Sequence, residues 1–327
     1  MVDLPFVAAI FLSSLAITFV AMPILIRKFS AASMTGRDVN KPGAQEVAEM
    51  GGLGIVMGAI GSLLIAIALQ TFFGYPFRLI EMLAAMLTIM IISVIGTYDD
   101  LFSMRQAIKA LVPMAAALPL VAVSAAGSTL IHIPFIGQFD FGFFYIFLLI
   151  PLGVTVSSNL TNMLAGFNGM EAGMGSVMFA TTLLLAFANG SIEMAMISAA
   201  MLGALLAFLR FNWYPAKVFT GDIGNLTIGA ALAAAVIIGN LESAGAILVI
   251  PYVLDFFIKA YNRFPSTKWW GSLRAGKLYT LESRVRGLAQ LVMKLSGGIS
   301  EQKLVLTFIA AEGLCALLAI LLYGRVL

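Results

Sequence analysis

The feature that most constrains this chain is a series of long apolar runs that recurs from one end to the other. A helix needs about 20 apolar residues to cross the ~30 Å hydrocarbon layer of a bilayer. Hydrophobic residues make up 61% of the 327 residues and charged residues 11%, which excludes a water-soluble domain. Transmembrane β-strands would alternate over about ten residues, and LLIAIALQTFF at 63–73 does not alternate. The sequence therefore predicts an all-α polytopic membrane protein, with one domain over residues 1–327.

Ten segments have the length of a membrane-spanning helix. They cover residues 4–28, 51–73, 79–97, 107–126, 142–163, 174–189, 192–210, 218–239, 243–261 and 303–324. Between the fourth and fifth segments, STLIHIPFIGQFDFG alternates and contains Pro134 and Gly137, which predicts a short β-hairpin. The single cysteine, Cys315, lies in the last apolar run, so an intramolecular disulfide and a thiolate metal cluster are both excluded.

The basic residues indicate which side of the membrane each loop faces. Seventeen of the 19 Lys and Arg residues lie on the side of the loops that follow odd-numbered spans, and only Arg78 and Arg325 lie on the other side. Loops rich in Lys and Arg stay in the cytosol. We therefore expect both termini and the hairpin to be external, and loops 1-2, 3-4, 5-6, 7-8 and 9-10 to be cytosolic.

The polar side chains gather in the same five loops. They are Asp38, Asn40, Lys41, Glu49, Asp99, Asp100, Lys109, Asn159, Asn162, Asn168, Glu171, Asp222, Asn225, Arg284 and Arg286. Asp99 and Asp100 end a helix as adjacent carboxylates, which suits either a solvated helix end or a site with a cationic partner. Lys109 follows nine residues after Asp100, so it could fold back over these carboxylates or bind a phosphate.

Two further stretches favour a site for phosphates. FTGDIGN at 219–225 places glycines on both sides of Asp222 at a helix start, where free amide groups could receive an anion. Asp and Asn oxygens suit Mg²⁺, which takes one or two protein oxygens together with substrate phosphates. NLTNMLAGFNGME at 159–171 offers neutral amide oxygens that do not repel a pyrophosphate. Arg284 and Arg286 are either surface charges or a clamp for phosphates. Together these groups indicate a phosphate-rich substrate held at the membrane surface.

The chain resembles the polyprenyl-phosphate N-acetylhexosamine-1-phosphate transferases in five blocks that follow the family order. The blocks are GRDVNKPGAQEVAEMGG, DDLFSMRQAIK, NLTNMLAGFNGME, FTGDIGN and SRVR. Bacterial members typically read NxxNxxDGxDG, whereas Ala165 and Asn168 replace both aspartates here, so the block is similar to the eukaryotic and archaeal form that makes dolichyl-pyrophosphoryl-GlcNAc. The peptidoglycan branch carries histidines in loop 9-10, but the single histidine here is His132. Val285 stands where the eukaryotic enzyme has a histidine between two arginines.

The resemblance implies a role for each matching residue. Asn162 and Asp222 would hold Mg²⁺, or Mn²⁺, on the pyrophosphate, and Asp99, Asp100 and Lys109 would form the catalytic cluster. The implied substrate-binding residues are Lys41, Glu49, Asn159, Asn168, Glu171, Asn225, Arg284 and Arg286.

The resemblance also implies a reaction and a location. GlcNAc-1-phosphate would pass from UDP-GlcNAc to a polyprenyl or dolichyl phosphate, with release of UMP, at the cytosolic face of the plasma membrane of an archaeon or bacterium. This step would start the synthesis of a lipid-linked oligosaccharide for N-glycosylation or for a surface polymer. We expect the lipid to enter through a lateral apolar groove. A homodimer is possible, and no nucleic acid is expected as a partner.

Two alternatives remain at this stage. A sister enzyme would use another UDP-sugar, such as UDP-MurNAc-pentapeptide or UDP-GalNAc. A secondary transporter would also suit ten helices, although its acids would be expected at the bilayer midplane. Asp255 is the carboxylate that could serve a proton path, but a structural ion pair with Lys259, one turn further on, explains it equally well.

Overall fold

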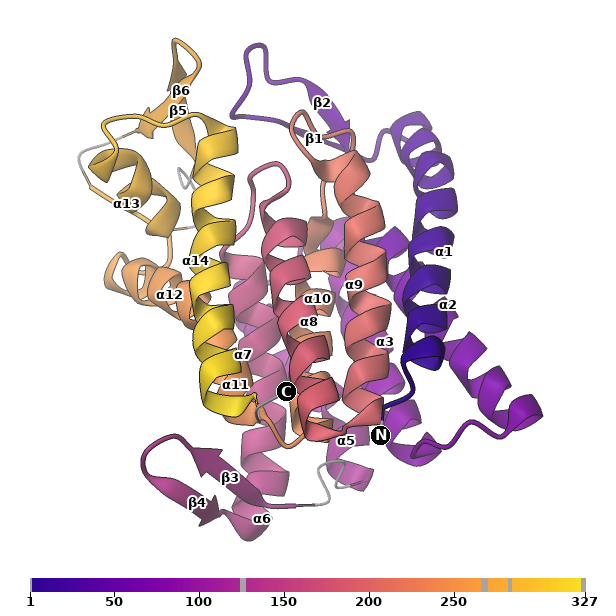
Figure 1. Cartoon of the computed structure of the whole chain (residues 1–327). Helices are drawn as coiled ribbons and strands as arrows, with labels where there is room; N and C mark the ends of the chain where they lie inside the picture. The colour runs from indigo at the N-terminus through magenta and orange to yellow at the C-terminus, as the bar shows by residue number, and fades with distance from the viewer. Residues whose placement is uncertain (1, 124–127, 266–269, 282–283, 325–327) are drawn as a thin grey trace.

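The structure is a bundle of helices with three small hairpins (Figure 1). The computed structural model describes residues 2–123, 128–265, 270–281 and 284–324. The longer helices are α1 (Leu4–Ala31), α2 (Gly52–Phe73), α3 (Leu79–Phe102), α4 (Gln106–Ala116), α7 (Ile150–Met163), α8 (Met170–Asn189), α9 (Ile192–Asn212), α10 (Gly221–Ile238), α12 (Ile250–Tyr261) and α14 (Glu301–Tyr323). The shorter helical elements are α5 (Leu118–Val123), α6 (Gly142–Phe144), a π-helical turn (Tyr145–Leu149), α11 (Glu242–Leu248) and α13 (Leu288–Leu295).

In the part of the chain that the structure describes, nine helices are long and apolar enough to span a membrane, or ten if α11 and α12 form one span. The predicted fold class is confirmed.

Two of the predicted spans are interrupted. The ninth, expected over 243–261, is divided into α11 and α12, which meet at an angle of 60°. Pro251 is at the second position of α12, where its missing N–H group suits a helix start and prevents a continuous helix. The fourth is divided into α4 and α5 at Ala117, and its last residues, 124–126, lie outside the described residues. Ser283 of the SRVR block also lies outside them.

The hairpins lie at opposite ends of the bundle. β1 (Thr35–Arg37) pairs with β2 (Glu46–Ala48) and β5 (Gly271–Arg274) with β6 (Lys277–Thr280) at one end, and β3 (Leu130–Ile133) pairs with β4 (Gly137–Asp140) at the other. All three pairs are antiparallel. The predicted hairpin between the fourth and fifth spans is confirmed, whereas the other two were not expected. In Figure 1, α1 begins and α14 ends at the β3–β4 end, which agrees with an even number of crossings.

Helix α10 forms the centre of the bundle and packs against α2, α3, α7 and α9. Its span is 89% buried. Two glycines bring neighbouring helices close to its first turn: a Cβ on Gly96 of α3 would lie 2.5 Å from the Cα of Ile223, and one on Gly52 of α2 would lie 2.3 Å from the Cα of Gly224. Small residues allow such close approach between membrane helices. The GDIGN segment is therefore held directly against α2 and α3.

Candidate active site

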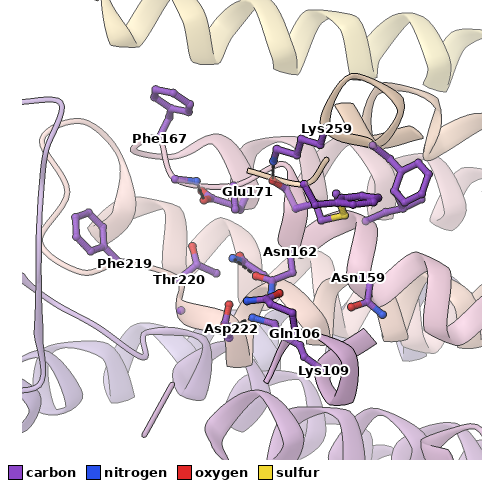
Figure 2. Close-up of a pocket in the computed structure, with 18 of the residues that line it drawn as sticks. Gln106, Lys109, Asn159, Asn162, Phe167, Glu171, Phe219, Thr220, Asp222 and Lys259 are labelled. Carbon is purple, nitrogen blue, oxygen red and sulfur yellow. Dashed lines mark hydrogen bonds and ion pairs between the residues drawn. The ribbon is translucent and has the colours of Figure 1, made fainter. Parts of the chain in front are cut away.

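A cavity of about 1240 Å³ opens among the loops at the β1–β2 end of the bundle. Its walls include residues of α3, α4, α7, α8, α10 and α12 and of the segment before α2. Figure 2 shows several of these side chains. Eight of the thirteen site residues predicted from sequence line it. They are Glu49, Asp100, Lys109, Asn159, Asn162, Glu171, Asp222 and Asn225. Asp99 does not line the cavity itself, but its carboxylate contacts Lys109, which does.

Lys109 is shared by two carboxylates that come from two other helices. Its Nζ lies 2.7 Å from Oδ2 of Asp222 on α10 and also contacts Oδ2 of Asp99 on α3. The other oxygen of Asp99, Oδ1, accepts a 2.6 Å hydrogen bond from the amide of Met104. Of the two possibilities that the sequence raised for Lys109, the structure shows the first, because Lys109 folds back onto Asp99 of α3. Its binding of a phosphate stays a prediction. Helices α3, α4 and α10 therefore meet at one ammonium group.

Asp100 lines the cavity and has two backbone partners that the sequence did not predict, while its place in the catalytic cluster stays a prediction. Its Oδ1 accepts a 2.7 Å hydrogen bond from the amide of Asp222, and its Oδ2 accepts a 3.0 Å bond from the amide of Ile223. The sequence suggested that amide groups here receive a substrate anion, and for these two groups that is wrong, because Asp100 occupies them. The positive end of a helix dipole favours such a carboxylate. Asp100 thus caps α10 and fixes the backbone that carries Asp222.

Asn162, one of the two residues predicted to hold a metal, lies beside Asn225, whose Oδ1 has no hydrogen-bond partner among the described residues. Nδ2 of Asn225 donates to Oδ1 of Asn162 at 3.2 Å, while Oδ1 of Asn225 is buried and accepts no hydrogen bond from any described residue. Asn225 follows Asp222 by three positions on α10, so both lie on one face. A buried amide oxygen without a donor is a natural cation ligand, and one carboxylate with one or two amide oxygens suits Mg²⁺.

The local charge also favours a cation. Glu49, Asp100 and Asp222 line the same cavity as Lys109, and Asp99 contacts the Lys109 ammonium, so four carboxylates lie in this part of the site. Burial raises the pKa of Glu49 above its usual range, and the negative charge of Asp222 raises it further. In the described residues, no three His, Cys, Asp or Glu side chains form an all-protein metal cluster. The donor set therefore fits a metal that completes its coordination with substrate phosphates and water.

Asn159 near the end of α7 and Glu171 at the start of α8 mainly hold neighbouring segments in place. Asn159 lines the cavity, and its Nδ2 donates to the carbonyls of Thr155 and Ala110, which connects α7 to α4. Glu171 accepts a 2.5 Å hydrogen bond from the amide of Gly166 through its Oε1 and so closes the loop on itself. These contacts explain in part why polar residues follow an apolar helix here.

Asn168 and Lys41 do not line the cavity, and they belong to a buried network that reaches the cavity wall at Asp38. Nδ2 of Asn168 donates to Asp38 at 3.1 Å, and its backbone amide donates to Glu301 at 2.8 Å. Lys41 lies 2.8 Å from Asp38 and 2.6 Å from Glu301. Its ammonium also lies 4.4 Å from the ring centroid of Tyr214. This inter-loop network (Asp38, Lys41, Asn168 and Glu301) connects three segments that are far apart in the sequence.

The two arginines of the last block do not line the cavity. Nε of Arg284 donates to Oδ1 of Asn262 at 2.6 Å, and the Arg284 side chain is exposed. The backbone amide of Arg286 donates to Gln290 at 2.9 Å. The structure therefore does not bring these residues together with Asp222 and Lys109, and their contact with the substrate stays a prediction.

Sequence reasoning did not assign two cations of the cavity wall, Arg37 and Lys259, to the site. Lys259 of α12 lines the cavity, forms a 2.7 Å ion pair with Asp255 and donates to the carbonyl oxygen of Met163 (Figure 2). The structural interpretation of Asp255 is thus confirmed. The i, i+4 spacing of the pair was visible in the sequence, but the position of Lys259 beside α7 depends on the bend between α11 and α12.

The fold and the cavity together define an integral membrane protein with a polar, charged site at one end of its helices. The profile of glycosyl transferase family 4 matches residues 82–240. A protein of Saccharolobus solfataricus is 34% identical over 95% of both chains and carries the provisional name UDP-N-acetylglucosamine–dolichyl-phosphate N-acetylglucosaminephosphotransferase. A Dictyostelium discoideum protein with the same name, not provisional, is 27% identical over 92% of this chain and 84% of its own.

A bacterial relative represents another branch. The phospho-N-acetylmuramoyl-pentapeptide-transferase of Shouchella clausii is 33% identical over 73% of this chain and 74% of its own. The chain described here belongs to glycosyl transferase family 4.

Proposed function

We propose that this protein transfers GlcNAc-1-phosphate from UDP-GlcNAc to a polyprenyl or dolichyl phosphate and releases UMP. The observation that carries the proposal is the cluster of Asp99, Lys109 and Asp222 beside the Asn162–Asn225 amide pair, in a cavity that also has an apolar wall. Such a cavity suits one ligand rich in phosphate and one with a long apolar chain. The names of the archaeal and eukaryotic relatives support the same substrates.

Asp222 and Asn162 would hold Mg²⁺, with Oδ1 of Asn225 as a further oxygen. When bound, the metal neutralises charge on the pyrophosphate of the donor. The chain itself supplies the arrangement of the ligands: Asp100 fixes the first turn of α10, and the hydrogen bond from Asn225 orients the amide of Asn162.

The acceptor needs no base for the transfer. A phosphate monoester has its second pKa near ~6, so the lipid phosphate is mostly a dianion at neutral pH. One of its oxygens attacks the β-phosphorus of UDP-GlcNAc, and the bond from that phosphorus to the bridging oxygen breaks, which releases UMP. Lys109 stabilises the charge that develops on the phosphoryl oxygens, and Asp99 holds Lys109 in place.

The lipid must reach the site from the bilayer. Val156 of α7 and Val253, Phe256 and Phe257 of α12 form an apolar part of the cavity wall. We assign the lateral entry of the lipid to this side, between α7 and α12. The excess of basic residues at the cavity end of the bundle supports a cytosolic site, in the plasma membrane of an archaeon or bacterium.

The test is UMP release by the purified protein in detergent, with a polyprenyl phosphate, Mg²⁺ and one UDP-sugar at a time. We expect UMP from UDP-GlcNAc, little from UDP-GalNAc or UDP-MurNAc-pentapeptide, and loss of the activity on chelation of the metal. Asp222→Ala should lower the rate by about a hundredfold or more. Absence of UMP with every sugar from well-folded protein would reject the reaction. Preference for UDP-MurNAc-pentapeptide would place the protein in the sister branch.

A further inference from the structure

The cavity has two chemically different sides. On one side lie Glu49, Asp100, Asp222 and Lys109, and on the other lies the apolar wall of Val156, Val253, Phe256 and Phe257. Lys259 is on the second side: it belongs to α12, like three of the four apolar residues, and follows Phe256 by three positions on the same face. In Figure 2, Asn162 lies between Lys259 and the pair of Lys109 and Asp222.

The contacts of Lys259 leave it able to bind an anion. Its side chain is 15% exposed, and its Nζ contacts one carboxylate oxygen of Asp255 and the carbonyl of Met163. An ammonium group has three N–H donors, so one remains for a ligand, with no described residue as its partner. Lys109 is different, because both of its partners are carboxylates, Asp99 and Asp222.

Asp255 holds Lys259 in this place. One oxygen of Asp255 pairs with Lys259, and the other accepts a 2.7 Å hydrogen bond from the amide of Leu288, at the start of α13. The ammonium is therefore fixed between α12, α7 and the segment before α13, away from the acidic side of the cavity. Arg37, Lys109 and Lys259 are the cationic side chains among the described residues of the wall. Of these, Lys259 shares a helix face with the apolar residues.

We propose that Lys259 binds the phosphate of the lipid acceptor. This inference rests on the function proposed above. The acceptor carries its charge at the end of an apolar chain, so its phosphate belongs where an apolar wall meets the polar part of the cavity. A lysine is suited to this place, because its methylene stem packs along apolar residues while its ammonium meets the phosphate. The donor, whose pyrophosphate binds at Asp222, makes no use of Lys259.

The kinetic test separates the two substrates. Lys259→Met keeps the length of the side chain and removes its charge, and we expect the KM for the polyprenyl phosphate to rise about tenfold or more, since hydrogen bonds to charged groups contribute that much. The KM for UDP-GlcNAc should stay unchanged, and Lys259→Arg should restore most of the acceptor affinity. Lys277→Met, which removes an exposed lysine of β6, serves as the matched control and should behave like the wild type. An unchanged acceptor KM in Lys259→Met, or a raised KM for UDP-GlcNAc alone, would overturn the proposal.

A merely structural role makes a different prediction. If Lys259 only ties Asp255 to α7, then Asp255→Asn should raise the acceptor KM as much as Lys259→Met does. We expect Asp255→Asn to raise it much less, because the substituted amide still offers an oxygen to Lys259 and the carbonyl of Met163 still holds the ammonium at the wall.

A binding measurement tests Lys259 without catalysis. Farnesyl phosphate, a short polyprenyl phosphate, should raise the Tm of the wild-type protein, whereas farnesol and inorganic phosphate should not. This rise should be absent in Lys259→Met and present in Lys259→Arg, and each variant first has to elute as a monodisperse peak. Equal protection of wild type and Lys259→Met by farnesyl phosphate would reject the site, and equal protection by inorganic phosphate would reject the lipid as its ligand. If the wild type binds farnesyl phosphate through Lys259 but releases no UMP, the proposed function fails while the site stands.

Discussion

Asp99 and Asp100 are neighbours in the sequence, yet their carboxylates have different partners. Asp99 holds Lys109, whereas Asp100 accepts hydrogen bonds from the amides of Asp222 and Ile223. Asp100→Asn replaces one acceptor oxygen by an NH₂ group, so one amide of α10 loses its partner. We expect the protein to be destabilised by about 1–3 kcal/mol, measured as a lower Tm, and UMP release to fall as Asp222 shifts. A Tm equal to that of the wild type would show that Asp100 does not cap α10 in solution.

Asp222→Asn is the matched variant for this comparison. Lys109 keeps its pair with Asp99, and Oδ1 of the new asparagine still accepts a hydrogen bond. We therefore expect little loss of Tm together with a loss of UMP release of about a hundredfold or more. The pair of variants separates a capping carboxylate from one that acts on the substrate.

Glu49 gives the site a pH dependence with a defined sign. Its pKa in the folded protein lies above the ordinary value of 4.5, because of burial and then of the charge of Asp222. The folded state therefore binds the proton more tightly than the unfolded state, and ionised Glu49 lowers stability. This cost is absent below pH 4.5, grows as the pH rises toward the folded pKa, and is complete above it.

Glu49→Gln should therefore be more thermostable than the wild type at pH 7.5 without divalent cations, and the difference should vanish at about pH 4. Addition of Mg²⁺ should reduce the difference, because a cation stabilises the ionised carboxylate. Thermal unfolding followed across this pH range is the measurement. A variant that is less stable than the wild type at pH 7.5 would mean that ionised Glu49 has a favourable partner.

At the scale of elements, the close approach of α3 to α10 determines where Asp222 lies. A Cβ on Gly96 would lie 2.5 Å from the Cα of Ile223, too close for any side chain unless the backbone moves. Gly96→Ala should cost about 1–3 kcal/mol as an overpacked contact and should lower UMP release. Gly153→Ala in α7 is the control, because a Cβ there meets no atom within 4 Å, and a helical alanine should be neutral or stabilising. Equal Tm values for the two variants would reject the close approach.

The elements that the sequence predicted are those determined by local composition. Long apolar runs predicted the spans, and alternation around Pro134 and Gly137 predicted β3–β4. The break between α11 and α12 was missed because a proline near the start of an apolar run is compatible with both a bent and a straight span. β1–β2 and β5–β6 were missed because their sequences, TGR with EVA and GSLR with KLYT, do not alternate between apolar and polar residues.

In the site, too, the contacts that the sequence predicted are local and the contacts that it missed are long-range. The contact between Lys109 and Asp99 was predictable because only ten residues separate them. The cap of Asp100 on α10 and the pair of Lys41 with Glu301 were not, because their partners are separated by 122 and 260 residues. Neither contact leaves a sequence signal, since each depends on how helices pack across the whole bundle. Lys41 forms ion pairs with Asp38 and Glu301 in the structure, and the contact with the substrate that the resemblance implied stays a prediction.

At the scale of the whole molecule, charge and architecture lead to one orientation. The hairpin β3–β4, the start of α1 and the end of α14 lie at the same end of the bundle, and the cavity lies at the other (Figure 1). Seventeen of the 19 basic residues were assigned to the cavity side. The positive-inside rule predicts that this end faces the cytosol. The orientation bears on the proposed function, because the UDP-sugar has to reach the cavity from the side on which the cavity opens.

Labelling of single cysteines in intact cells tests this orientation. Cys315 is the sole cysteine, so Cys315→Ser provides a background without thiols. Gln138→Cys places a thiol on the exposed strand β4, and Lys277→Cys places one on the exposed start of β6, at the other end of the molecule. A membrane-impermeant maleimide should label position 138 in intact cells, and position 277 only after the membrane has been permeabilised. The reverse pattern would place the cavity on the outer side of the membrane and would contradict the positive-inside rule. The proposed reaction would then have no supply of UDP-GlcNAc.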